Sequence, residues 1–187
     1  MLFIILISII MLQRGAELAL ARRNEKWMKG MGALEFGQRH YRWIVAVHAS
    51  FFVCYLLEVI IFKKNLSPFW PILLTLFFLT QTVRIWALHS LGRYWNTKII
   101  VLPGAEVVRR GPYRFIKHPN YAIVAAEFLV IPLMFQAYIT AAVFTLLNIA
   151  VLSVRIPAEE KALKELTEYE ETFLRLRSCL NRDIKKV

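Results

Sequence analysis

The stretch GPYRFIKHPNY, residues 111–121, is aromatic, basic and rich in turn-forming residues. Long apolar runs lie on both sides of it. A dense polar cluster beside a membrane segment needs an explanation, because charged groups are costly in lipid and often functional there. We interpret this stretch as one half of a binding site, and we expect a second cluster, around Arg155 and Glu159, to supply the other half.

The composition of the chain indicates a membrane protein. Hydrophobic residues make up 58% of the 187 residues, and the mean hydropathy is +0.49, whereas a soluble domain has about 45–50% apolar residues. The net charge of +11 is better explained by loops that face the cytoplasmic leaflet than by nucleic-acid binding, because no basic stretch lies on a soluble domain. A single membrane domain over residues 1–187 is the natural expectation for this length.

Five apolar runs predict an all-α integral membrane protein with about five transmembrane helices. The runs cover about residues 1–21, 43–62, 69–89, 121–135 and 138–154. A cleaved signal peptide is the alternative for the first run, since Ala19-Leu20-Ala21 resembles a cleavage triplet. The missing positive n-region argues against it. Arg14 and Glu17 also interrupt this run, and they are one helical turn apart and able to pair.

The basic residues predict the orientation of the chain. The connector 22–42, the long loop 90–120 and the tail after Arg155 are all rich in Lys and Arg, whereas the opposite side has only Lys63 and Lys64. The positive-inside rule therefore places the N-terminus outside and the C-terminus and the long loop in the cytoplasm. After Pro157 an apolar stripe at three- and four-residue steps predicts an amphipathic C-terminal helix. The stripe consists of Leu163, Leu166, Tyr169, Phe173, Leu176 and Leu180.

The last two runs are separated by only two residues and predict a helical hairpin. Tyr121 and Arg155 should therefore lie together at its open end, and Arg155 and Glu159 share a helix face unless Pro157 breaks the helix. A purely structural interpretation stays open. Lys-His-Pro at 117–119 can be an interfacial anchor before a helix, and Arg155 can reach lipid phosphate. The residues by themselves indicate a site but no reaction.

Other polar residues receive no assigned function from the sequence. Four ionisable residues lie within the spans, where pairing inside the protein is the default expectation; they are His48, Glu58, Arg84 and Glu127. Cys54 and Cys179 have no Cys or His partner at metal-ligand spacing. We therefore expect free thiols and no metal site.

Two motifs in this chain resemble those of a known family. Residues 111–121 are similar to the GxYRxxRHPxY signature of the isoprenylcysteine carboxyl methyltransferase family, and residues 155–163 (RIPAEEKAL) are similar to its second signature, RxxxEExxL. Residues 91–95 and 107–108 also fit the region before the first signature. The resemblance covers about residues 90–175, after three predicted spans in residues 1–89.

The resemblance implies a membrane enzyme that transfers a methyl group from S-adenosylmethionine to an oxygen of a lipophilic acceptor. Arg155 would orient the oxygen anion of the acceptor. Seven residues would bind the cofactor: Val108, Tyr113, Lys117, His118, Pro119, Asn120 and Glu159. Lys117 departs from the family pattern, which has Arg there, and Lys lacks the planar fork of Arg.

The resemblance leaves the acceptor and two alternative functions open. The acceptor would be a prenylated cysteine or, as for some bacterial relatives, a long-chain alkylpyrone. The compact loops are typical of a bacterial protein of the cell membrane, in contact with membrane lipids. An NADPH-dependent membrane reductase of the sterol and steroid reductase type has a similar C-terminal region. A small scaffold or half-transporter is the non-enzymatic alternative, although no inverted repeat is visible.

Overall fold

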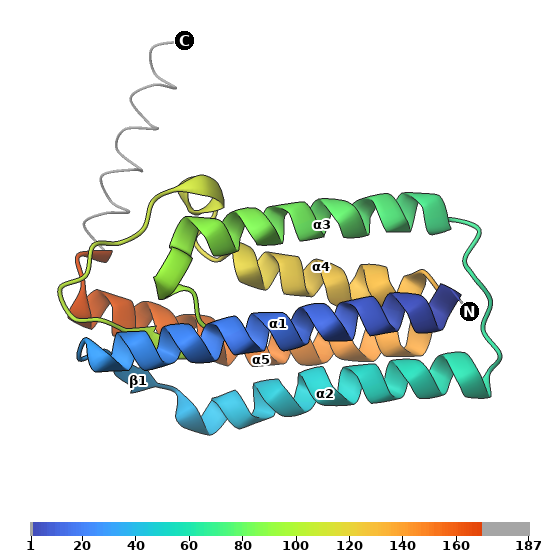
Figure 1. Cartoon of the computed structure of the whole chain (residues 1–187). Helices are drawn as coiled ribbons and strands as arrows, with labels where there is room; N and C mark the ends of the chain where they lie inside the picture. Colours follow the sequence, from blue (N-terminus) through green and yellow to red (C-terminus); the bar gives the residue numbers. More distant parts are fainter. Residues whose placement is uncertain (1, 170–187) are drawn as a thin grey trace, which may run out of the picture.

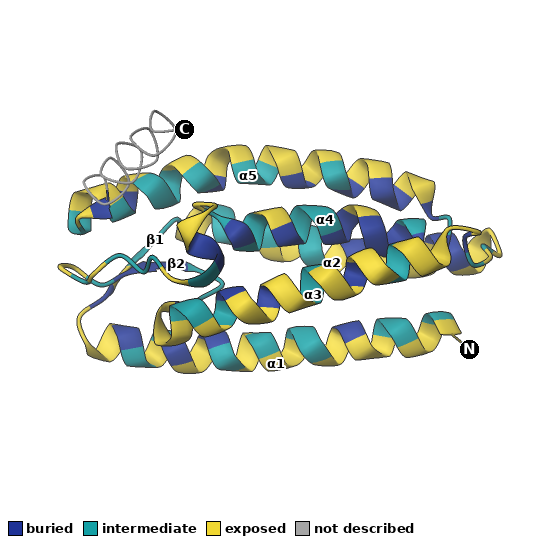
Figure 2. Ribbon diagram, turned by 90° about the horizontal axis from the view of Figure 1, so that it is seen from above, coloured by how far each residue is buried: buried dark blue, intermediate teal, exposed yellow. Residues whose placement is uncertain are grey.

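The computed structural model describes residues 2–169 and contains five long helices that run side by side (Figure 1). One end of the bundle carries the N-terminus and the connection between the second and third helices. The opposite end carries two short strands and the loops that precede the fourth helix (Figures 1 and 2). In chain order the elements are α1 (Leu2–Gly30), β1 (Leu34–Phe36), α2 (Gln38–Ile61), α3 (Trp70–Leu91), η1 (Gly92–Tyr94), β2 (Ile99–Val101), η2 (Gly111–Arg114), α4 (Pro119–Leu133) and α5 (Tyr138–Leu166).

Four of the helices, α1, α2, α3 and α5, are long and apolar enough to cross a membrane. Their outer faces are largely exposed, as a lipid-facing surface requires (Figure 2). The helix α4 lies where the fourth run predicted it but has only 15 residues. At about 1.5 Å per residue it is shorter than the roughly 30 Å of hydrocarbon in a bilayer. The protein is an all-α integral membrane protein, as predicted, with four long spans and one shorter helix in place of five similar ones.

The helices at both ends of the chain extend further than predicted. The helix α1 continues to Gly30 rather than ending near residue 21, and Glu25 and Lys29 form an i,i+4 ion pair of 2.6 Å in its added turns. The helix α5 continues through Pro157 to Leu166 rather than ending near residue 154. A proline removes only one backbone donor, and at the water-facing end of a span the freed carbonyl can be solvated.

The first residues of the expected amphipathic C-terminal helix therefore continue α5 and do not form a separate helix. Leu163 and Leu166 belong to α5, and Tyr169 lies just after it. The rest of the predicted apolar stripe, from Phe173 onward, lies outside the described residues.

A small antiparallel sheet joins the connector after α1 to the long loop. The strands β1 and β2 pair in the register Leu34 with Val101 and Phe36 with Ile99. Lys98, beside β2, forms ion pairs with Glu25 (2.7 Å) and Glu35 (3.3 Å). Its hydrogen bond to Glu25, together with that to Glu35, holds the pKa of Lys98 above its usual value. The long loop is thus attached to the end of α1.

Aromatic side chains form the centre of the bundle. The ring of Phe51 on α2 packs edge-to-face on Phe128 of α4 (4.7 Å between centroids) and on Phe144 of α5 (5.4 Å). Tyr55 is fully buried, and its hydroxyl donates to the carbonyl of Ile131 at 2.9 Å. This cluster holds α2, α4 and α5 together below the end that carries the loops.

Glu58 caps the N-terminus of α5. Its carboxylate accepts hydrogen bonds from the backbone N–H of Ile139 (3.2 Å) and Thr140 (2.7 Å) and from the Thr140 hydroxyl (2.6 Å). Glu58 is buried, so a carboxylate facing unpaired N–H groups and the positive end of the helix dipole is stabilised there. Glu58, although it lies within a span, therefore has a structural function.

We predict that Glu58→Leu destabilises the protein by about 3 kcal/mol, because it leaves two N–H groups and one hydroxyl buried without acceptors. Unfolding in mixed detergent micelles, followed by circular dichroism, measures the change. Ser50→Ala is the matched control on the same helix, since the Ser50 hydroxyl is exposed and bonds only to carbonyls of its own helix. Equal stability of the Glu58→Leu and Ser50→Ala proteins would contradict the capping role.

Candidate functional site

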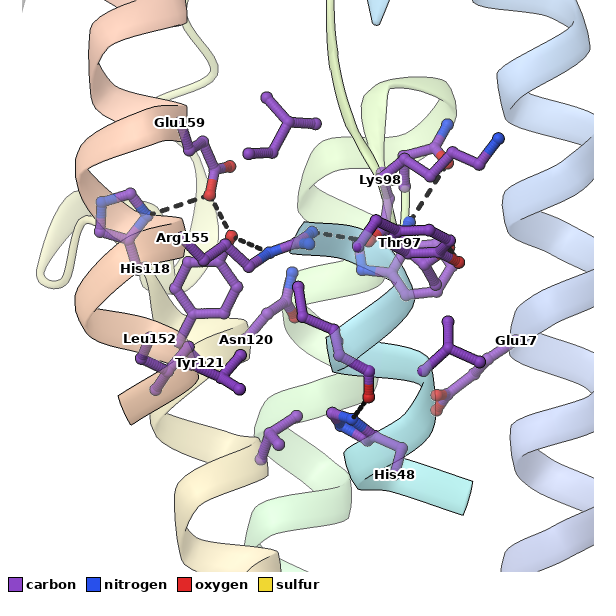
Figure 3. Close-up of a pocket in the computed structure, with 18 of the residues that line it drawn as sticks. Glu17, His48, Thr97, Lys98, His118, Asn120, Tyr121, Leu152, Arg155 and Glu159 are labelled. Carbon is purple, nitrogen blue, oxygen red and sulfur yellow. Dashed lines mark hydrogen bonds and ion pairs between the residues drawn. The ribbon is translucent and has the colours of Figure 1, made fainter. Parts of the chain in front are cut away.

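A cavity of about 450 Å³ opens among the helices at the end of the bundle that carries the strands. Its outer wall is polar and comes from the loop around Thr97, the start of α4 and the last turns of α5 (Figure 3). Further in, apolar side chains of α2, α4 and α5 line it, and α1 closes one side. These apolar residues include Ile44, Phe51, Val124, Phe128, Val151 and Leu152. The cavity thus joins a polar mouth to an apolar interior.

A chain of hydrogen bonds links α4, α5 and the loop at the mouth. The Arg155 Nε donates to the Tyr121 hydroxyl at 2.7 Å, and its Nη2 donates to the carbonyl of Thr97 at 2.6 Å. The Tyr121 hydroxyl in turn donates to Glu159. Arg155 is only 6% exposed, so these bonds fix the guanidinium in the cavity wall (Figure 3). We call Glu159, Tyr121, Arg155 and the Thr97 carbonyl the relay.

His118 lies between the two carboxylates of α5. Its Nε2 is 3.1 Å from Glu160 and its Nδ1 is 3.8 Å from Glu159. The imidazole also stacks on the Tyr121 ring, with 5.3 Å between centroids. Lys117 is 3.6 Å from Glu160. Residues 117–121 are therefore held against α5, and the mouth of the cavity combines carboxylates with basic groups.

Tyr113 and Asn120 form a second polar pair in the wall. The Asn120 Nδ2 donates to the Tyr113 hydroxyl at 2.9 Å, while the Asn120 Oδ1 is buried and has no partner among residues 2–169. Burial, reinforced by the negative charge of Glu159, raises the pKa of the Tyr113 phenol above its usual value. The phenol therefore stays protonated, and the pair offers a ligand one open acceptor and one hydroxyl.

The structure brings together nearly all residues that the two signatures singled out. Tyr113, Lys117, His118, Pro119, Asn120, Arg155 and Glu159 all line the cavity. Val108 does not line it and lies in the loop before η2. Pro157 does not break α5, so Arg155 and Glu159 share one face, as an unbroken helix requires.

Sequence reasoning missed two members of the relay. The hydroxyl of Tyr121 connects Arg155 to Glu159, whereas its position in the sequence predicted only that Tyr121 lies close to Arg155. Its place as the last residue of the first signature was the available signal. Thr97 takes part through its backbone carbonyl, which no side-chain pattern could reveal.

The inner end of the cavity is lined by a charged cluster within the bundle. Arg14 bonds to Glu17 at 2.6 Å, as its sequence spacing predicted, and to both oxygens of Glu127 at 2.8 and 2.7 Å. Arg84 bonds to Glu127 and, at 3.2 Å, to Glu17. Two positive and two negative charges thus balance, which reduces the cost of placing them in lipid. The expected internal pairing of Arg84 and Glu127 is confirmed.

Comparison with known proteins agrees with this picture. The model of the isoprenylcysteine carboxyl methyltransferase (ICMT) family matches residues 73–165. An uncharacterized protein of Bacillus subtilis, YpbQ, is 50% identical over 163 residues, which is 87% of this chain and 97% of the relative. An uncharacterized protein of Haemophilus influenzae is 29% identical over 170 residues, or 89% of this chain and 98% of that relative. No solved structure gives a significant match.

The matched range includes both halves of the cavity mouth, from Tyr113 to Tyr121 and from Arg155 to Glu159. The relatives align along nearly their whole length, so the resemblance extends beyond the two signatures. The chain is a membrane methyltransferase that belongs to the isoprenylcysteine carboxyl methyltransferase family.

Proposed function

We propose that the protein transfers a methyl group from S-adenosylmethionine to an oxygen of a lipophilic acceptor dissolved in the membrane. The observation that carries this proposal is one cavity that has the carboxylate of Glu159 and the buried Arg155 at a polar mouth and apolar walls further in. The mouth suits a polar, water-soluble cofactor, and the interior suits an apolar acceptor. The match to a methyltransferase family favours this function over the NADPH-dependent reductase.

The residues at the mouth fit S-adenosylmethionine chemically. Glu159, which lines the mouth, carries a negative charge that complements the sulfonium or amino group of the cofactor. The buried Oδ1 of Asn120, which has no partner among residues 2–169, can accept a hydrogen bond from an amino or hydroxyl group of a ligand. When bound, the cofactor supplies an electrophilic methyl group. The chain's own task is to align this group with the acceptor oxygen, because alignment is a major contribution to an in-line displacement.

Arg155 is the residue best placed to orient an acceptor anion. Its Nε and Nη2 are held by the relay, and its Nη1 bonds to no residue among 2–169. A fixed guanidinium beside a low-dielectric interior favours an oxygen anion strongly. This holds for the carboxylate of a prenylated cysteine and for the enolate of a long-chain alkylpyrone, the two acceptor classes that we consider.

The arrangement of the helices suggests how each substrate reaches the cavity. The basic connector, the long loop and the end of α5 all lie at the mouth end (Figure 1), which supports a cytoplasmic mouth, with the N-terminus outside. Reporter fusions at both termini test this orientation. On the lipid side, Met11 and Leu18 of α1 and Val45 of α2 line the cavity and are partly exposed. We place the acceptor's route from the bilayer between α1 and α2.

The proposal predicts that membranes containing the protein transfer labelled methyl groups from S-adenosylmethionine to a lipid-soluble acceptor. Chromatography of the extracted lipids, with delipidated protein analysed in parallel, measures the transfer. Membranes with the Arg155→Ala protein are the control for background labelling. Absence of label from both fractions, together with tight binding of NADPH, would contradict the methyltransferase function.

Glu159→Ala should weaken the binding of S-adenosylmethionine about 10- to 100-fold, because it removes a charge-assisted contact. Calorimetry with the purified protein in detergent measures the dissociation constant. Glu165→Ala is the matched control, since Glu165 lies on the same helix, is exposed and, among residues 2–169, forms an ion pair with Lys161 alone, at 3.8 Å. An unchanged affinity of the Glu159→Ala protein would remove Glu159 from the cofactor site.

Arg155→Ala should lower turnover about 100-fold or more and leave the affinity for the cofactor nearly unchanged, since it removes an oriented positive charge from the reacting oxygen. Arg155→Lys should recover only part of the activity, because lysine keeps the charge but cannot form both relay bonds. Steady-state kinetics and calorimetry separate the two effects. Loss of cofactor affinity with normal turnover would mean that Arg155 serves the cofactor instead of the acceptor.

A further inference from the structure

His48 of α2 lines the inner part of the cavity, and nothing in the proposed mechanism uses it. It lies outside residues 73–165, the range matched by the family model. The imidazole packs on Phe128 with 5.1 Å between ring centroids. Figure 3 shows His48 on the same cavity as Arg155, with Asn120 between them in this view. A histidine inside a membrane span that faces a ligand cavity is a candidate for function.

The hydrogen bonds of His48 define its protonation pattern. Its Nδ1 lies 2.8 Å from the carbonyl of Ile44. A carbonyl can only accept, so Nδ1 carries the proton and Nε2 of the neutral ring keeps its lone pair. Among residues 2–169, no hydrogen-bond donor contacts Nε2. The ring is partly exposed and lines the cavity, so Nε2 is an open acceptor in the cavity wall.

The other ionisable groups that line the inner end already have charged partners. The carboxylates of Glu17 and Glu127 are held by Arg14 and Arg84 in the balanced cluster described above. At the mouth, Glu159 accepts the hydrogen bond of the Tyr121 hydroxyl, and Arg155 is held in the relay. His48 is therefore the available base at the inner end of the cavity among the described residues.

We propose that His48 Nε2 accepts the hydroxyl proton of the methyl acceptor, and that the acceptor is a long-chain phenol or enol rather than a carboxylate. This inference rests on the proposed function. A carboxylate is already ionised at neutral pH and has no proton to donate. It would place an anion against the lone pair of Nε2. A phenol or enol donates its O–H to Nε2 while its oxygen faces Arg155.

The proton and charge balance of the step is complete. The acceptor oxygen bonds to the methyl carbon as the bond from that carbon to the cofactor sulfur breaks, and the electron pair of that bond stays on sulfur. The O–H bond breaks, and its proton ends on Nε2. The positive charge of the sulfonium is thus replaced by that of an imidazolium, which later releases its proton to water.

The test compares acceptors that differ in acidity but share one chain. We expect the protein in nanodiscs to methylate 4-dodecylphenol and 4-dodecyl-2-nitrophenol, and to leave dodecanoic acid unmodified. His48→Gln keeps a polar side chain but cannot take up a proton. At about pH 9, where the nitrophenol is largely ionised and 4-dodecylphenol is not, His48→Gln should slow the methylation of 4-dodecylphenol about 100-fold and change that of the nitrophenol by less than about threefold. His89→Gln, the same change at an exposed position away from the cavity, should change neither rate.

A second measurement needs no catalysis. The chain has four histidines, so ¹⁵N-labelled histidine gives a small set of signals, in which His48→Gln identifies that of His48. Addition of 4-dodecylphenol without cofactor should shift the His48 Nε2 signal, and dodecanoic acid should not. Methylation of dodecanoic acid but of no phenol, an equal loss of both phenol activities in His48→Gln, or an unmoved Nε2 signal would each overturn the proposal. Failure of the proposed function itself would instead appear as no methyl transfer to any acceptor and no calorimetric binding of S-adenosylmethionine.

Discussion

A charged side chain inside a bilayer must find its partner within the protein, and this constraint organises the structure. The helix α1 carries Arg14 and Glu17 in the middle of its apolar run. These charges pair with each other and also with Arg84 of α3 and Glu127 of α4, which α1 faces. Buried ion pairs contribute little net stability but exclude other arrangements strongly, since an unpaired partner would be very costly. The cluster therefore sets which face of α1 turns inward, and with it one wall of the cavity.

The same constraint explains why the site has two unlike ends. At the inner end two arginines bond to two glutamates, so the net charge that these four residues offer to a ligand is near zero. At the mouth, Arg155 and the carboxylate of Glu159 line the cavity. A cofactor with several charges and an acceptor with a long apolar body therefore meet different surfaces. Arg155 lies at the boundary between them, because α5 carries it at the level where α4 begins.

Much of this arrangement could be predicted from local sequence. The apolar runs predicted the helices, and the short link between α4 and α5 predicted that Tyr121 and Arg155 would meet. The spacing of Arg14 and Glu17 predicted their pairing, and that of Arg155 and Glu159 predicted a shared face. The ends of α1 and α5 were predicted too short, because hydropathy marks where lipid ends and a helix can continue into water. Val108 was expected at the cofactor site from resemblance, but it does not line the cavity.

The sequence by itself determined that the protein lies in a membrane, that its two signatures carry the side chains of the mouth from Tyr113 to Tyr121 and from Arg155 to Glu159, and to which family it belongs, since these properties depend on hydropathy and on short motifs. Tertiary structure alone decided that Glu127 receives Arg14 and Arg84, that the carbonyl of Thr97 completes the relay, and that His48 faces the same cavity as Arg155. The physical reason is that these contacts join helices far apart in the chain. Each depends on the rotation of a whole helix about its axis, which the packing of its neighbours sets.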